Sequence, residues 1–131
     1  MNPQKKILIV DDENFIRLLL HRTLEDFEFE NVQISLASDG EQGLAMALEQ
    51  APDLVFLDLM MPGLDGLEVC QRIRQNTDMK HTYIVLLTAK GNVPLGNGGI
   101  GPDCSLTKPF DPDQIVALTS EVLGIDIDDG F

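Results

Sequence analysis

Five residues with charged or hydroxyl side chains each follow a short apolar run of the sequence: Asp11, Asp12, Asp58, Thr88 and Lys108. If these runs are strands of an open parallel sheet, their carboxyl ends lie at one edge, where ligands bind in such sheets. The residues that follow the strands then meet at that edge. The sequence therefore predicts three carboxylates, a hydroxyl and an ammonium group gathered at one site.

This set of side chains suits the phosphorylation of a carboxylate. Three carboxylates at close range repel one another and do not all stay ionised without a cation. Mg²⁺ prefers oxygen ligands and commonly binds one or two carboxylates, water and a phosphate oxygen. A lysine ammonium pairs with a carboxylate or with an incoming phosphoryl oxygen, and a hydroxyl donates to the same oxygen. Phosphoryl transfer depends mainly on positioning and charge neutralisation of this kind.

The apolar runs predict five strands, because they are short and rich in β-branched residues: Ile7–Val10, Val32–Leu36, Leu54–Leu57, Tyr83–Leu87 and the weaker Cys104–Thr107. Segments with helical spacing lie between them, so the order predicts a parallel sheet with helices on both faces. The second run is followed by Ala37 and Ser38 and so by no charged side chain, as suits a strand at the edge of the sheet.

Apolar residues at helical spacing predict two helices, one traced from Phe15 to Phe27 and one from Leu44 to Ala51. Capping signals mark three helix starts: Asp39, Asp65 and Asp111. Gly124 is expected to end the last helix. The acidic tail of residues 125–131 is expected to be frayed. Residues 1–124 then form one domain, without repeats or an interdomain linker.

The stretch Gly91–Gly101 holds five of the eleven glycines and also Pro94. In a helix the proline would cost about 3 kcal/mol and three interior glycines about 1 kcal/mol each. This total of about 6 kcal/mol rivals the net stability of a domain, so no full helix is expected here. Gly96–Gly101 also fits G-x-G-x-x-G. We exclude a dinucleotide site, because its glycines directly follow a strand and open a helix.

The overall charge restricts the classes of partner. The 131 residues include 22 acidic and 9 basic side chains, for a formal net charge of −13. Such a surface repels nucleic acid and anionic membranes, so we expect neither as a direct partner. It suits cations and basic protein surfaces, although acidic surfaces also serve solubility alone.

The first apolar run, the cysteines and the histidines restrict the expected cellular location and chemistry of the protein. The first apolar run, Ile7–Val10, is too short for a signal-peptide core or a membrane span. Cys70 and Cys104 fit no metal-ligand spacing and are expected as small buried residues in a reducing cytoplasm. His21 and His81 stand alone in the sequence and are expected to be surface residues without partners.

Four motifs together resemble the receiver domain of two-component response regulators, the CheY-like family: Val10-Asp-Asp-Glu13, Leu57-Asp-Leu-Met-Met-Pro-Gly-Leu-Asp-Gly66, Leu87-Thr-Ala89 and Thr107-Lys-Pro-Phe110. The resemblance extends over nearly the whole chain. It implies an α/β fold with a doubly wound, five-stranded parallel sheet in the order 2-1-3-4-5, similar to flavodoxin and CheY. The family's fourth helix is then degenerate or replaced by the glycine-rich loop.

The resemblance also implies a role for each site residue. Asp58 is the implied phosphoacceptor, Lys108 pairs with the phosphoryl group, and the Thr88 hydroxyl closes on it. The implied Mg²⁺ ion is held by four groups: the carboxylates of Asp11, Asp12 and Asp58 and the backbone carbonyl of Met60. Pro109 is expected to follow a cis peptide bond.

The implied phosphodonor is a histidine kinase or a phosphotransfer protein, and the implied output is a changed contact with a downstream protein that the sequence does not identify. The domain would catalyse only its own phosphorylation and dephosphorylation, as a monomer or a weak phosphorylation-dependent dimer. Two other functions stay open. One is a receiver-like interaction module that works without phosphorylation, and the other is a small phosphatase with an aspartyl nucleophile.

The sequence departs from the family pattern at positions that bear on the signal and its lifetime. Ser105 stands three residues before the lysine, where family members usually have an aromatic residue. Met60 and Lys90 stand two residues after the acceptor and the threonine, and neither offers a strong acceptor for an attacking water. We therefore expect phosphorylation to reshape residues 89–103 and the phosphoryl group to be lost slowly.

Overall fold

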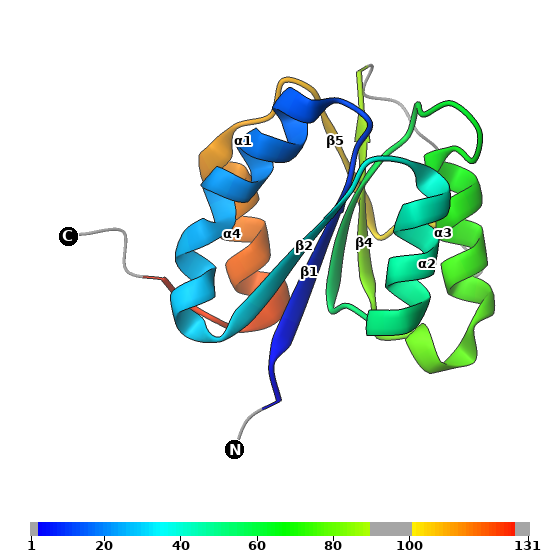
Figure 1. The fold of residues 1–131 in the computed structure, drawn as a ribbon. Helices are drawn as coiled ribbons and strands as arrows, with labels where there is room; N and C mark the ends of the chain where they lie inside the picture. The colour runs from blue at the N-terminus through cyan, green and yellow to red at the C-terminus, as the bar shows by residue number, and fades with distance from the viewer. Residues whose placement is uncertain (1–2, 90–100, 128–131) are drawn as a thin grey trace.

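The computed structural model describes residues 3–89 and 101–127. Its elements in chain order are β1 (Lys5–Val10), α1 (Asn14–Leu24), the 3₁₀ helix η1 (Glu25–Glu30), β2 (Val32–Ala37), α2 (Gly40–Gln50), β3 (Leu54–Asp58), α3 (Gly66–Gln75), the 3₁₀ helix η2 (Thr77–Met79), β4 (Tyr83–Thr88), β5 (Cys104–Thr107) and α4 (Pro112–Leu123) (Figure 1). None of the helices in these two ranges is both long and apolar enough to cross a membrane.

The five strands form one parallel sheet in the order β2-β1-β3-β4-β5. This confirms the predicted fold, and each predicted apolar run lies within one strand. The register sets the ends of the strands side by side, since Val10 pairs with Leu57 and Thr88 pairs with Thr107. The residues that end β3 and β4 and those that follow β1 and β5 therefore reach the same edge of the sheet.

Helices cover both faces of the sheet, with α1 and α4 on one side and α2 and α3 on the other (Figure 1). Side chains of β1 alternate between the two resulting cores. Ile7 and Ile9 lie in the core on the α1 and α4 side, whereas Leu8 and Val10 lie in the core on the α2 and α3 side. All four are completely buried, and each such side chain contributes about 1.5–3 kcal/mol to stability.

The three capping signals act as predicted, with changes of detail. Asp39 accepts a hydrogen bond from the backbone N–H of Gln42 (2.8 Å), but the Gln42 amide oxygen accepts from Ser38 and not from the cap residue. Asp65 caps α3 in the same way. Asp111 caps α4 by accepting from the backbone N–H of Asp113 (2.9 Å), one residue earlier than in a capping box, and a proline occupies the first helical position as predicted.

Two expectations about the helices are wrong in part. Phe15 was expected on the buried face of the first helix, but its side chain is 64% exposed, because Ile16 and Leu19 face the core instead. Phe27 is buried as expected, yet the α-helix has already ended at Leu24 and Phe27 belongs to η1. Apolar spacing predicts a face, but the end of the helix and the edge of the sheet decide which members of that face are covered.

The end of the last helix lies where the sequence placed it. Gly124 follows α4 with a φ angle of 68°, a left-handed conformation that glycine adopts without strain. Residues 125–127 are not frayed as expected, because Ile125 and Ile127 pack against the core on the α1 and α4 side. The rest of the predicted tail, residues 128–131, lies outside the described ranges. The predictions for Gly91–Gly101 and Lys90 concern residues that, apart from Gly101, lie outside the described ranges.

Candidate functional site

Four elements deliver the predicted residues to the carboxyl edge of the sheet. Asp11 follows β1, Asp58 ends β3, Thr88 ends β4 and Lys108 follows β5. Strand-like hydrogen bonds continue one residue beyond two of these strands. The Asp11 N–H donates to the carbonyl of Ala37 (3.2 Å) and the Lys108 N–H to that of Thr88 (2.7 Å). These bonds fix the backbone where each side chain enters the site.

The carboxylates form a tight cluster. One oxygen each from Asp11, Asp12, Glu13 and Asp58 lies within 4.8 Å of all the others. Asp11 and Asp58 are buried at 0% and 3% exposure. Glu13 was not predicted as a member of this cluster. Its backbone N–H donates to the Asp11 carboxylate at 2.8 Å, and this turn keeps Glu13 beside the site.

Lys108 lies among these carboxylates. Its Nζ atom is 3.0 Å from Asp11 Oδ2, 3.3 Å from Asp58 Oδ1 and 3.3 Å from Glu13 Oε1. Burial by itself would lower the pKa of Lys108, but the hydrogen bond and charge of Asp11, with the charges of Asp58 and Glu13, raise it above its ordinary value. Lys108 therefore stays an ammonium group throughout the neutral range.

One lysine does not balance this much negative charge. Burial, followed by the charge of Asp11, raises the pKa of Asp58 to about 7, although Lys108 acts in the opposite direction. A buried carboxylate in this state gains from a further cation. The donors available are the hard carboxylate oxygens of Asp11, Asp12, Glu13 and Asp58, so this cluster suits a hard divalent cation such as Mg²⁺.

Two glycines allow the chain around the site to pack closely. A Cβ atom at Gly66, the first residue of α3, would collide with the backbone carbonyl of Asp58. A Cβ atom at Gly40, the first residue of α2, would collide with the carbonyl of Leu64. Glycine at both positions lets the starts of the two helices lie directly against the loop after β3, which contains Met60.

Two smaller predictions can be compared with the structure, one for the peptide bond before Pro109 and one for His21. The Lys108–Pro109 peptide bond is cis, as the resemblance implied. His21 is not alone, because its Nε2 atom lies 3.7 Å from Glu28 Oε1. That contact bridges α1 and η1 and involves none of the predicted site residues.

The two cysteines are packing residues in a reduced state. Cys70 is buried and Cys104 is half-buried, and both are free thiols. Burial raises the pKa of the Cys70 thiol to about 11, so little reactive thiolate is present at neutral pH. The expected burial is confirmed for Cys70, whereas Cys104 is only partly buried against the core.

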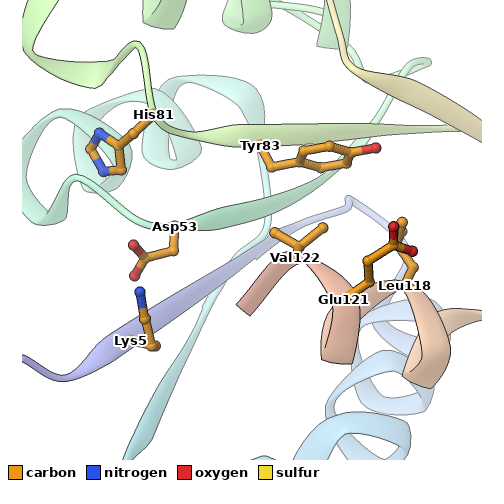
Figure 2. A pocket seen from close by; sticks show the side chains of 7 residues that line it. All are labelled: Lys5, Asp53, His81, Tyr83, Leu118, Glu121 and Val122. Atoms are coloured by element: carbon orange, nitrogen blue, oxygen red, sulfur yellow. The ribbon is translucent and has the colours of Figure 1, made fainter. Parts of the chain in front are cut away.

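A hollow of about 510 Å³ lies at the end of the sheet opposite the carboxylate cluster (Figure 2). Its lining residues are Lys5, Asp53, His81, Tyr83, Leu118, Glu121 and Val122. They come from the beginnings of β1 and β4, from the approaches to β3 and β4, and from α4. Ligands of open parallel sheets bind at the carboxyl ends of the strands, and none of the predicted site residues lies in this hollow.

Comparison with known proteins gives one consistent result. The family model of the response regulator receiver domain matches residues 7–120. The transcriptional regulatory protein ResD of Bacillus subtilis is 44% identical over 122 residues, which cover 92% of this chain and 48% of ResD. The alkaline phosphatase synthesis transcriptional regulatory protein PhoP of the same organism is 43% identical over 122 residues, 91% of this chain and 48% of PhoP. The chain thus spans about half the length of these relatives.

Solved structures share the same fold. The chemotaxis protein CheY4 of Vibrio cholerae superposes with a TM-score of 0.77 at 29% identity, covering 92% of this chain and 99% of that one. A CheY-like receiver domain protein of Methanospirillum hungatei superposes with a TM-score of 0.75 at 30% identity, covering 92% and 94%.

Proposed function

Because this chain belongs to the response regulator receiver domain family, we propose that Asp58 accepts a phosphoryl group from a histidine kinase or phosphotransfer protein, with Mg²⁺ bound beside it. The observation that carries the proposal is the convergence on Asp58 of an ammonium group 3.3 Å away and of the other carboxylates within 4.8 Å. These neighbours directly follow two other strands of the sheet, β1 and β5.

The side chains divide the work of the reaction. An oxygen of Asp58 forms the new bond to phosphorus while the bond between phosphorus and the donor breaks. When bound, Mg²⁺ would neutralise negative charge on the carboxylates and on one phosphoryl oxygen. Asp11 and Asp12 hold that ion, and the backbone carbonyl of Met60 remains a candidate ligand. Lys108, which keeps its proton, pairs with a second phosphoryl oxygen, and the Thr88 hydroxyl donates to the phosphoryl group.

The proposal extends to the role of the domain in signalling. The domain catalyses only its own phosphorylation and the loss of the phosphoryl group, in the cytoplasm. Phosphorylation alters the contact between this domain and a downstream protein. The domain acts as a monomer or as a weak phosphorylation-dependent dimer. The net charge of −13 disfavours direct contact of these residues with nucleic acid.

Intact-protein mass spectrometry after incubation with acetyl phosphate and Mg²⁺ tests the proposal. We expect a gain of one phosphoryl group, which EDTA and Asp58→Asn both abolish. Asp65→Asn is the matched control, because asparagine caps a helix as well as aspartate and Asp65 lies outside the cluster. A gain that persists in Asp58→Asn would identify another acceptor. No gain in the wild type would favour the interaction module that works without phosphorylation.

A further inference from the structure

Arg74, near the end of α3, joins three separate parts of the chain. Its side chain is only 8% exposed and pairs with the carboxylate of Asp103. Its Nε atom donates to the carbonyl of Gly101 (3.1 Å) and its Nη1 atom to the carbonyl of Thr82 (2.6 Å). All three guanidinium nitrogens are therefore engaged, in the rigid fork geometry that distinguishes arginine from lysine.

Asp103 connects this arginine to the sheet. Its backbone N–H donates to the carbonyl of Ile84 (2.8 Å), and its carboxylate accepts from the Ile84 N–H (2.8 Å). The same carboxylate holds Arg74. Asp103 is the residue directly before β5, so this group of contacts attaches the beginning of β5 to both β4 and α3.

β5 needs such an attachment more than any other strand. It has four residues, lies at the edge of the sheet and pairs only with β4. Short edge strands are held along one side alone, and a shift of one residue would turn every side chain to the opposite face. Lys108 follows β5 directly, so such a shift would move its ammonium group away from Asp11 and Asp58.

We infer that Arg74 and Asp103 form a clamp that fixes β5 against β4 and so positions Lys108 for the phosphorylation of Asp58. Both are positioning residues, since they act through Lys108 and touch none of the reacting atoms. The inference rests on the proposed function, because it assigns these two residues to that same reaction.

The first test compares Arg74→Met with Arg72→Met, which makes the same change at an exposed position of α3. We expect Arg74→Met to slow phosphorylation by acetyl phosphate by about tenfold to a hundredfold, the usual cost of displacing a reacting group by about 1 Å. Affinity for Mg²⁺ should stay close to that of the wild type, because the carboxylates proposed to bind the metal lie directly after β1 and at the end of β3. Arg72→Met should match the wild type in both measurements.

A double-mutant cycle separates positioning from general loosening. In a Lys108→Ala background, Arg74→Met should cause no further loss of rate, because the residue through which it acts is already gone. Asp103→Asn is the milder variant. It keeps an acceptor for the Ile84 N–H and removes only the charge, so it should slow the reaction less. If Arg74→Met does not fold, Asp103→Asn decides the question in the same cycle.

Hydrogen exchange at residues 104–107 and the NMR signal of the Lys108 ammonium group test the clamp without phosphorylation. Both should change in Arg74→Met and not in Arg72→Met. Three results would refute the clamp. These are a folded Arg74→Met variant that is phosphorylated at the wild-type rate, a loss of Mg²⁺ affinity as large as the loss of rate, or a further loss of rate when Arg74→Met is added to Lys108→Ala. A wild type that takes no phosphoryl group would refute the proposed function, and the NMR and exchange results would then decide the clamp by themselves.

Discussion

Asp58 combines burial with a shortage of neutralising charge. Its pKa in the folded metal-free protein is about 7, against an ordinary value of 3.8. A carboxyl group with a raised pKa stabilises the folded state below its unfolded value, and that contribution is lost as pH rises through the folded value. The metal-free protein should therefore lose stability between about pH 4 and pH 7 through this group.

Asp58→Asn should remove that loss. We expect the variant to exceed the wild type in free energy of unfolding by about 2 kcal/mol at pH 8 in EDTA, and to equal it near pH 4. Urea unfolding across this pH range provides the measurement, with Asp65→Asn as the control that keeps the wild-type pH dependence. A constant difference between the variant and the wild type at all pH values would contradict the role assigned to the Asp58 charge.

Met60 bears on the lifetime of the phosphoryl group. Its side chain is 73% exposed, and its backbone N–H lies 3.3 Å from Asp58 Oδ1. An apolar side chain there does little to hold an attacking water, whereas an amide would accept its hydrogen bond. We expect Met60→Asn to speed dephosphorylation severalfold once acetyl phosphate is removed. Leu48→Asn, an exposed site on α2, should leave the rate unchanged. Equal rates in all three proteins would show that Met60 does not slow hydrolysis.

Among the elements, the starts of the helices determine the shape of the site more than their ends do. Gly66 begins α3 against the Asp58 carbonyl with no room for a Cβ atom, whereas Gly124 follows α4 with open space around it. Gly66→Ala should therefore displace Asp58 and lower both stability and phosphorylation rate. Gly124→Ala should cost about 1 kcal/mol, through its left-handed backbone alone, and leave the rate unchanged. Chemical denaturation and acetyl phosphate kinetics on both variants check the contrast. A wild-type phosphorylation rate in Gly66→Ala would count against it.

The elements also show how far sequence reasoning extends. The strands were predictable because short β-branched runs are local signals, and parallel order then brought Asp58 and Lys108 together. Glu13 was missed because its place in the cluster depends on a backbone hydrogen bond to Asp11. The Arg74–Asp103 pair was missed because its residues lie 29 positions apart, and no local pattern joins them.

For the whole molecule, the two ends of the sheet have different chemistry. The carboxyl end gathers four carboxylates, three of which pair with one lysine, whereas the hollow at the amino end mixes acidic, basic and apolar side chains (Figure 2). This acidic cluster belongs to a chain that already carries a net charge of −13. Repulsion within the folded protein therefore has a general component, which any salt screens, and a local component at Asp58, which only a bound cation relieves.

Comparing NaCl with MgCl₂ at equal ionic strength separates these components. NaCl should raise the melting temperature of the wild type and of Asp58→Asn alike, by about 3–6 °C for about 1 kcal/mol of screened repulsion. MgCl₂ should also raise the free energy of unfolding of the wild type by about 2.7 kcal/mol when the Mg²⁺ concentration is one hundred times the dissociation constant. Asp58→Asn should show a smaller rise, because it lacks one ligand. Equal responses of both proteins to the two salts would mean that Mg²⁺ acts on the general charge and not at Asp58.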